Sequence, residues 1–149
     1  MAMMTLQEIS DRLEIDQLLS NYSFAIDDRD WNGLDDIFTP DAFIDYTAAG
    51  GISGSLTEIK AWLPDAMERF PMFQHMVATT QLVLDDNTAT SRTILFNPMV
   101  YKDKDGVEDT FFIGLWYRDN LSRTDAGWRI TRRVEERGWT KHAPRLDAS

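Results

Sequence analysis

The spacing of hydrophobic residues changes along the chain from a helical period to a period of two. In the first half, apolar positions recur at the spacing of one helix face. Thr5-Leu6-Gln7-Glu8 matches a capping box, in which the threonine side chain and the glutamate close the first turn of a helix reciprocally. This helix is predicted to run to about Asp28, and its apolar positions include Leu18, Leu19, Tyr22 and Ile26.

Two further helices are predicted in this half. Asp30 is placed to cap a short helix that stops at Thr39-Pro40-Asp41 and holds Leu34, Ile37 and Phe38. A longer helix follows from about Thr57 to Phe70, and Pro71 ends it. The apolar positions of the longer helix are Ile59, Trp62, Leu63, Met67 and Phe70.

A short strand and a loop separate these two helices. The segment Ala42–Tyr46 alternates, with Ala42, Ile44 and Tyr46 on one face. Residues 47–54, TAAGGISG, contain three glycines and are predicted to form a flexible loop. Such a loop is suited to close over a pocket.

Beyond residue 73 the period changes to two, which predicts four long strands. The segments between them, residues 85–87, 102–106 and 120–127, have the composition of turns. Short connections between long strands predict an antiparallel meander. The four predicted strands are Gln74–Leu84, Ala89–Tyr101, Val107–Arg118 and Trp128–Trp139.

Helices followed by a meander predict an α+β fold, a cone-shaped α+β barrel with N-terminal helices packed on a curved, mainly antiparallel sheet. Such a cone leaves a pocket between the helices and the sheet, where a small ligand would bind. A chain of 149 residues is long enough for one domain with a substantial core. We therefore expect a single domain over residues 1–149, ordered over about 5–140, with a tail over 141–149.

The charge of the chain bears on its partners. The formal net charge is −10, and phosphate backbones and anionic membranes attract basic surfaces instead. Several arginines do gather near the end, but Glu135 and Glu136 lie among them, which favours a charge-paired strand over a nucleic-acid patch. Binding to nucleic acid or to membranes is therefore not expected. The arginines are Arg129, Arg132, Arg133 and Arg137.

The remaining composition limits the class of protein and the kinds of site that the chain can form. The hydrophobic share of 43% is too high for general disorder, and no apolar run approaches the length of a membrane span. The first ten residues lack the features of a signal peptide, so a cytoplasmic location is expected. There is no cysteine, which excludes disulfides and thiolate metal sites, and the two histidines lack metal-ligand spacing. We expect no metal and no other cofactor.

His75 is the main candidate for chemistry, because it stands in an otherwise apolar and hydroxyl-rich segment, FQHMVATT. One interpretation is a structural histidine. The other is a general base, since imidazole titrates near neutral pH and needs a carboxylate on its second nitrogen. Asp27 and Asp28 are the candidate partners. On a helical wheel, however, Asp27 shares a stripe with polar residues, which favours exposure to water. These residues are Asp16, Ser20 and Ser23.

Two tyrosines and a set of larger side chains complete the candidate site. Tyr46 lies on the apolar face of its strand, and both Tyr46 and Tyr22 are compatible with a core role or with hydrogen-bond donation to a substrate carbonyl. Arg132 is placed to reach the pocket from the last strand, although a surface ion pair is the alternative. The other candidates for lining the pocket are Trp62, Met67, Phe96, Met99, Phe111 and Ile113.

Three segments carry a resemblance to a known family. Residues 25–46, AIDDRDWNGLDDIFTPDAFIDY, resemble the opening of scytalone dehydratase-like proteins of the SnoaL-like group, within the nuclear-transport-factor-2-like, cystatin-like fold. Residues 74–75, QH, and 127–139, GWRITRRVEERGW, are similar to the corresponding segments of that group. The likeness in layout covers roughly Leu6 to Trp139 and implies the same cone-shaped fold.

The resemblance also implies a site. Enzymes of the group, which include dehydratases and a dehydrochlorinase, hold a dyad of an aspartate at the end of the first helix and a histidine at the start of a strand. The matching positions are Asp27 and His75, and the family tyrosines match Tyr22 and Tyr46. Relatives commonly form trimers or dimers, so a homo-oligomer is expected.

The chain departs from scytalone dehydratase in the polar groups around this dyad. The second active-site histidine of that enzyme is replaced by the segment 97–99, Asn-Pro-Met, and its serine and asparagine by Phe111 and Ile113. Ile26 stands in place of a second tyrosine. The resemblance therefore implies related chemistry on a more apolar substrate than scytalone.

Three functions are compatible with these features. The first is a cofactor-free lyase of the dehydratase type, which eliminates water from a small, largely apolar cyclic or aromatic substrate. The second is an isomerase or cyclase that uses the same dyad. The third is a small-molecule-binding module or a non-catalytic subunit like the β-subunits of ring-hydroxylating dioxygenases, which share this fold.

Overall fold

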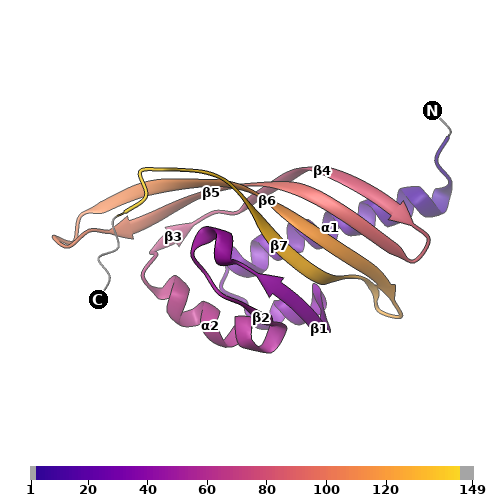
Figure 1. Cartoon of the computed structure of the whole chain (residues 1–149), viewed down its shortest axis with the longest axis horizontal. Helices are drawn as coiled ribbons and strands as arrows, with labels where there is room; N and C mark the ends of the chain where they lie inside the picture. Colours follow the sequence, from indigo (N-terminus) through magenta and orange to yellow (C-terminus); the bar gives the residue numbers. More distant parts are fainter. Residues whose placement is uncertain (1–2, 145–149) are drawn as a thin grey trace.

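Two helices pack against the inner face of a strongly curled sheet in the computed structural model, which describes residues 3–144 (Figure 1). The part of the predicted tail that covers 145–149 lies outside the described residues. None of the helices between residues 3 and 144 is long and apolar enough to cross a membrane. The helical elements are α1 (Leu6–Asp27), η1 (Asn32–Asp36), η2 (Thr47–Ala49) and α2 (Leu56–Glu68). The strands are β1 (Phe38–Asp45), β2 (Ser53–Ser55), β3 (Met72–Phe73), β4 (Met76–Asp85), β5 (Thr88–Lys102), β6 (Glu108–Thr124) and β7 (Gly127–Lys141).

Capping boxes begin both α-helices. In α1, the Thr5 hydroxyl accepts the Glu8 backbone N–H and the Glu8 carboxylate accepts the Thr5 backbone N–H, as the sequence predicted. In α2 the same exchange joins Ser55 and Glu58. The predicted first and third helices are thus confirmed to within two residues at each end.

The strands form one seven-stranded mixed sheet with the order β2-β1-β7-β6-β5-β3, in which β4 also pairs with β5. Strands β4 to β7 form the predicted antiparallel meander, while β1 runs parallel to β7. The α+β class and the helices on one face of a curved sheet are confirmed. Figure 1 shows α1 and α2 beneath the arch of the long strands.

Bulges in the long strands produce the curl. The register shifts between Gly114 and Leu115 and between Asn120 and Leu121 on β6, where β7 carries an extra residue each time. The first bulge brings Gly138 against Gly114, where a Cβ on Gly138 would collide with the Gly114 carbonyl and one on Gly114 with the Trp139 ring. Only glycine fits at this bend.

Two local predictions were wrong at element boundaries. The second helix is only the short η1, and Phe38, Thr39 and Pro40 already belong to β1. Pro40 is tolerated there because it falls within the irregular stretch of the pairing with β7 between Phe38 and Phe43. The predicted loop 47–54 likewise contains η2 and the start of β2.

The predicted turn over 120–127 is also shorter than expected. Strand β6 continues to Thr124, and residues 125–126 alone connect it to β7. The polar residues of β6 that suggested a turn are paired with β7, and Leu121 between them lies in the core. Polar residues near a strand end resemble a turn in sequence.

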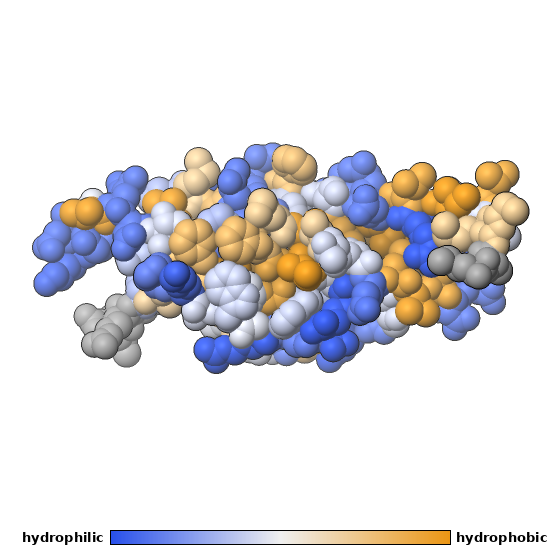
Figure 2. Space-filling view, turned by 90° about the horizontal axis from the view of Figure 1, so that it is seen from above, coloured by the Kyte–Doolittle hydropathy of each residue, from blue (hydrophilic) through white to orange (hydrophobic). Residues whose placement is uncertain are grey.

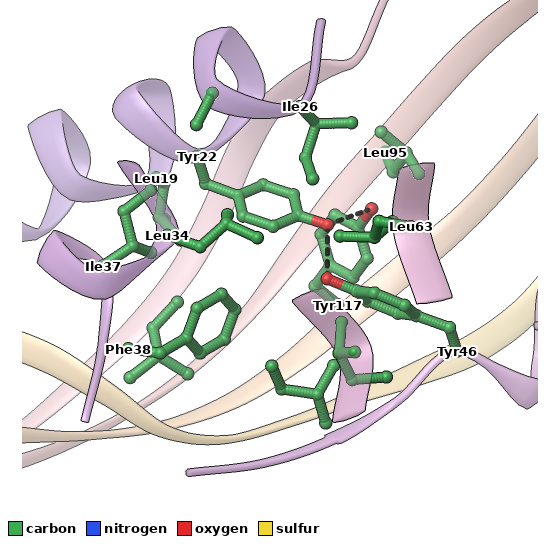
Figure 3. Packing of buried hydrophobic residues seen from close by; sticks show 14 of the residues in the cluster. Leu19, Tyr22, Ile26, Leu34, Ile37, Phe38, Tyr46, Leu63, Leu95 and Tyr117 are labelled. Carbon is green, nitrogen blue, oxygen red and sulfur yellow. Dashed lines mark hydrogen bonds between the residues drawn. The ribbon is translucent and has the colours of Figure 1, made fainter. Parts of the chain in front are cut away.

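The core fills the space between α1, α2 and the concave face of the sheet (Figure 3). It includes the predicted face Ala42, Ile44 and Tyr46, all buried, of which Tyr46 directly follows the end of β1. Burial of such side chains provides the main stabilisation of the fold, at roughly 1.5–3 kcal/mol for each large apolar side chain. Figure 3 labels Leu19, Tyr22, Ile26, Leu34, Ile37, Phe38, Tyr46, Leu63, Leu95 and Tyr117.

A buried ion pair crosses this core. Arg133 on β7 donates from Nε and Nη2 to the two carboxylate oxygens of Asp119 on β6, at 2.8 and 2.7 Å, and both side chains have no solvent exposure. A charge in such a place costs several kcal/mol to desolvate, and the bidentate geometry offsets that cost only while both partners are present.

A second network ties α1 to the end of the sheet. The Arg123 guanidinium donates two hydrogen bonds to the buried Asp11 carboxylate, which also accepts the indole N–H of Trp128 at 3.1 Å and the Gln7 amide at 3.0 Å. These hydrogen bonds, Arg123 first, hold the pKa of Asp11 at about 2.

Replacing Asp119 by asparagine should destabilise the domain strongly, because it leaves the Arg133 charge buried without a counter-charge. We expect Asp119→Asn to lower the free energy of unfolding by about 3–5 kcal/mol, measured by urea denaturation. Asp125→Asn, in the exposed hairpin of the same meander, is the control and should stay within about 0.5 kcal/mol of wild type. Equal effects of the two variants would contradict this account.

The Asp11 network should make stability depend on acid pH. The folded state holds the pKa of Asp11 at about 2, below its ordinary value of 3.8 in the unfolded chain. The ionised carboxylate therefore contributes stability above about pH 4, and this contribution is lost as the pH falls toward 2. Urea titrations between these limits should show a shallower pH dependence for Asp11→Asn than for wild type. Identical slopes would show that the network contributes nothing.

Candidate active site

A cavity of about 460 Å³ lies between the helices and the concave face of the sheet. Its walls are mostly apolar, and the polar groups that line it come from α1, the segment after β1, the end of α2, the segment before β4, and the strands β5 to β7. The predicted pocket is therefore present. Its apolar residues include Ile26, Leu63, Phe70, Leu95 and Leu115.

The structure brings Asp27 and His75 together at this cavity. Asp27 Oδ1 lies 2.7 Å from His75 Nδ1, and the two carboxylate oxygens also accept the His75 backbone N–H at 3.1 and 2.9 Å. The His75 side chain is only 8% exposed and that of Asp27 22%. The helical wheel was wrong to favour a solvated Asp27, because a residue at the last position of a helix meets the chain that returns past its end.

The geometry fixes the tautomer of the neutral imidazole. A carboxylate can only accept a hydrogen bond, so Nδ1 carries the proton and the Nε2 lone pair of the neutral ring faces the other way. Asn97 on β5 lies there, with its Nδ2 3.3 Å from His75 Nε2. Asn97 is buried, and its Oδ1 accepts no hydrogen bond within residues 3–144.

Arg29 holds the two chain segments in place. It adopts a left-handed conformation, with φ of 58°, directly after the C-cap of α1 and reverses the chain. Its guanidinium donates to the carbonyls of Met67 at 3.0 Å and Phe70 at 2.7 Å, at the end of α2, and lies 4.9 Å above the Phe73 ring. The last turns of both helices and the segment that carries His75 are thus joined by one side chain.

Three tyrosine hydroxyls, those of Tyr22, Tyr46 and Tyr117, converge in the core (Figure 3). Tyr22 of α1 lies 2.8 Å from the hydroxyl of Tyr46, and 3.5 Å from that of Tyr117 on β6. The Tyr22 ring also meets the His75 ring edge to face, with centroids 6.5 Å apart. Both predicted tyrosines are therefore near the histidine, and Tyr117 is a third that the sequence did not single out.

These hydroxyls retain one unused donor. Three O–H groups provide three protons, and the two contacts between them use two. The third proton, on Tyr22, Tyr46 or Tyr117 according to the direction of the two contacts, is free to donate to a ligand in the cavity. Burial raises the pKa of all three phenols, so they remain protonated donors near neutral pH.

The buried guanidinium of Arg133 supports this tyrosine cluster from below. It lies 4.1 Å from the centroid of the Tyr22 ring and 4.0 Å from that of Tyr117. A cation against both ring faces fixes their positions and favours negative charge on the nearby oxygens.

Glu135 is the acidic side chain of the cavity wall, two positions after Arg133 on β7. Its Oε2 accepts the backbone N–H of Ala49 at 3.0 Å, which fastens the η2 segment to the sheet. Burial raises the pKa of Glu135 to about 7. Next to η2, Gly51 leaves room for Tyr46 and Trp62, since a Cβ there would lie 2.9 Å from both.

Five of the seven residues predicted to line the pocket do so: Trp62, Met67, Met99, Phe111 and Ile113. The other two lie elsewhere. Phe96 is on the opposite face of β5, where it stacks on Phe112, because strand neighbours point to opposite faces. Arg132 is exposed and lies 4.9 Å above the Phe43 ring.

A bulge explains why Arg133 and Glu135 were missed as site residues and Arg132 was chosen. Trp128 and Ile130 are buried, so strict alternation along the strand would place the Arg132 side chain on the same inner face. Thr131 is an extra residue in the pairing with β6, so the inward phase moves by one position at this point. Asn97 and Tyr117 were also missed, although the alternation of their strands indicates that they point inward. Each lies two positions after a buried leucine, Leu95 and Leu115 respectively.

Within the described part of the chain, no group of three or more histidine, cysteine, aspartate or glutamate side chains is arranged to hold a metal ion. The chemistry available from the arrangement is that of a base oriented by a carboxylate, opposite neutral hydroxyl donors in an apolar cavity.

Comparison with known proteins identifies relatives over nearly the whole chain. The uncharacterised protein Rv2910c of Mycobacterium tuberculosis (strain ATCC 25618 / H37Rv) is 49% identical over 140 residues, which cover 94% of each chain. A candidate scytalone dehydratase of Novosphingobium aromaticivorans DSM 12444 has a similar structure, with a TM-score of 0.82, 18% identity, and coverage of 98% of this chain and 100% of that one.

A hexachlorocyclohexane dehydrochlorinase, LinA type 2, is also similar in structure, with a TM-score of 0.76, 14% identity, and coverage of 97% of this chain and 96% of the other. At these identities the likeness shows the fold, which is the predicted nuclear-transport-factor-2-like, cystatin-like one. The SnoaL-like domain model matches residues 7–134. The chain therefore belongs to the SnoaL-like family.

Proposed function

We propose that this protein is a cofactor-independent lyase of the dehydratase type. It removes a proton next to a carbonyl and eliminates water from a small, largely apolar cyclic or aromatic substrate. The observation that carries the proposal is the Asp27–His75 hydrogen bond at the wall of an apolar cavity. The similar fold of a dehydrochlorinase, which is named for an elimination, supports it.

The first step is proton abstraction by His75. Nε2 takes the proton from the carbon next to the carbonyl, and the electron pair of that C–H bond moves toward the carbonyl oxygen. Asp27 keeps Nδ1 protonated before the step and stabilises the imidazolium formed by it. The apolar walls exclude water, which strengthens this interaction.

The tyrosine cluster receives the negative charge that develops. Its one unused hydroxyl proton is the donor for the substrate carbonyl, and Arg133 beneath the rings favours charge at this position. Because the hydroxyls and the guanidinium are already ordered, little reorganisation is needed at the moment of reaction.

Asn97 is suited to serve both states of the base. Its amide N–H₂ meets the lone pair of neutral His75, and rotation of the amide would present its Oδ1 to the N–H of the imidazolium. Asn97 thus acts as a positioning residue, in the segment 97–99 that replaces the region of the second histidine of scytalone dehydratase.

The test uses two steps that can be followed separately. Deuterium loss from α-deuterated benzylacetone, followed by NMR, reports proton abstraction alone. Conversion of its β-hydroxy derivative to the conjugated enone, followed by ultraviolet absorbance, reports elimination. Wild type should catalyse both. Exchange without elimination would favour the isomerase, and absence of both would remove the proposal in favour of a binding module.

His75→Gln should lower the rate of deuterium loss by about 10²–10⁴-fold, the usual contribution of a general base. Asp27→Asn should lower it as well, because an amide no longer enforces one tautomer of His75. Long-range ¹H–¹⁵N spectra of the imidazole should show the proton on Nδ1 in wild type and a mixture in Asp27→Asn.

Asp28→Asn is the matched control for the aspartate. It makes the same change at the next position, where the side chain is exposed. Its exchange rate and its imidazole spectrum should equal those of wild type. A loss of activity in Asp28→Asn as large as in Asp27→Asn would show that general charge, and not the dyad, sets the rate.

A further inference from the structure

We propose that Glu135 is a second catalytic acid–base residue, whose carboxylic acid donates a proton to the departing hydroxyl group while His75 takes the proton from carbon. This inference rests on the proposed function, because it concerns the second half of the same elimination. It assigns the acid to β7 and the base to the segment between β3 and β4.

The position of Glu135 suits a group that touches a ligand. Its side chain lines the same cavity as His75 and the three tyrosines. One oxygen, Oε2, is held by the Ala49 N–H. For the other oxygen, Oε1, no hydrogen-bond partner exists among residues 3–144, so it is left to interact with a substrate.

Glu135 also lacks the counter-ion that a structural carboxylate would have. Arg133 is two positions away on the same face, but its guanidinium is turned to Asp119 in a bidentate pair. The neighbouring carboxylate Glu136 shows the contrast, since it points to the outer face and pairs with Arg92 and Arg118. No salt bridge joins Glu135 to a cation within the described residues.

The groups that face Glu135 leave it balanced between its two forms. Burial raises its pKa to about 7, the Ala49 N–H and the Arg133 charge act against this, and the Asp45 carboxylate on β1 adds to it. The other titratable side chains around it are the protonated phenols of Tyr22, Tyr46 and Tyr117. His75 and Arg137 line the same cavity. A substantial fraction of Glu135 is thus a neutral acid at neutral pH, as a proton donor requires.

The step balances in protons and electrons. The carbanion pair formed by His75 becomes the new carbon–carbon double bond, and the carbon–oxygen bond breaks with its electrons on oxygen. The Glu135 proton converts that oxygen to water. The products are the unsaturated ketone, water, the Glu135 carboxylate and the His75 imidazolium, and proton exchange with solvent restores both side chains.

Two variants separate proton donation from attachment of the η2 segment. In Glu135→Gln the amide oxygen still accepts the Ala49 N–H, but the side chain has no acidic proton to transfer, whereas Glu135→Ala loses both functions. Glu136→Gln is the control. It makes the same change at the next position of β7, where the side chain points to the outer face of the sheet. The probes are α-deuterated benzylacetone, its β-hydroxy derivative, and the acetate ester of that derivative, whose leaving group needs no proton.

Glu135→Gln should keep deuterium exchange and elimination of acetate at the wild-type rate, and lose about 10²–10⁴-fold in elimination of water. In wild type, kcat for water elimination should fall as the pH rises through about 7, since the acid form of Glu135 is then lost, and this fall should be absent in the variant. Equal losses for both leaving groups, or an unchanged rate for water, would overturn the inference.

A titration of the carboxyl ¹³C signals tests the inference without any substrate. The signal missing from Glu135→Gln should have a midpoint near 7 in wild type, and a midpoint near the ordinary glutamate value would overturn the acid role. Failure of the proposed function has a different signature, since wild type would then eliminate no water from the β-hydroxy derivative. The two failures can therefore be told apart.

Discussion

A fully buried guanidinium lies where helix α1 meets the concave face of the sheet, and much of the site depends on it. Arg133 is held by Asp119 and lies against the rings of Tyr22 and Tyr117. Nε and Nη2 of Arg133 donate to the Asp119 carboxylate, whereas Nη1 is buried without a hydrogen-bond partner within residues 3–144. The charge therefore depends on the carboxylate and on the two ring faces, and these groups and the two strands are fixed together. The tyrosine cluster is ordered by the constraint that this charge imposes.

The Asp27–His75 dyad is also held in place by its surroundings. Here hydrogen bonds that involve backbone groups have the role that the buried ion pair has for the tyrosine cluster. Asp27 accepts both the ring and the backbone N–H of His75, and Arg29 fastens the end of α1 to the end of α2. Asp27 is the last residue of α1 and His75 directly precedes β4, so the helix end, the start of the strand and the loop after β1 meet at the cavity. This arrangement allows variation of the apolar lining without loss of the proton-transfer groups.

The proposed acid and base have environments that differ as their roles require. His75 has a carboxylate partner on Nδ1, which leaves Nε2 as the nitrogen that would accept a proton. Glu135 is half-buried without a paired cation, which favours the neutral acid. The sheet bulge at Thr131 is responsible for the second environment, since it turns Glu135 to the cavity and leaves Arg132 outside.

The sequence alone determined the elements and much of the site. Period, capping boxes and turn composition gave α1, α2 and the meander, and the family segments gave Asp27, His75, Tyr22 and Tyr46, because these depend on local or inherited patterns. Tertiary structure decided the rest. A bulge changes which face a residue occupies without marking the sequence, so Arg133 and Glu135 appeared as surface charges. The end of a helix contacts segments that no wheel contains, so Asp27 seemed solvated. Sequence periodicity describes one element at a time, whereas the cavity is formed by several.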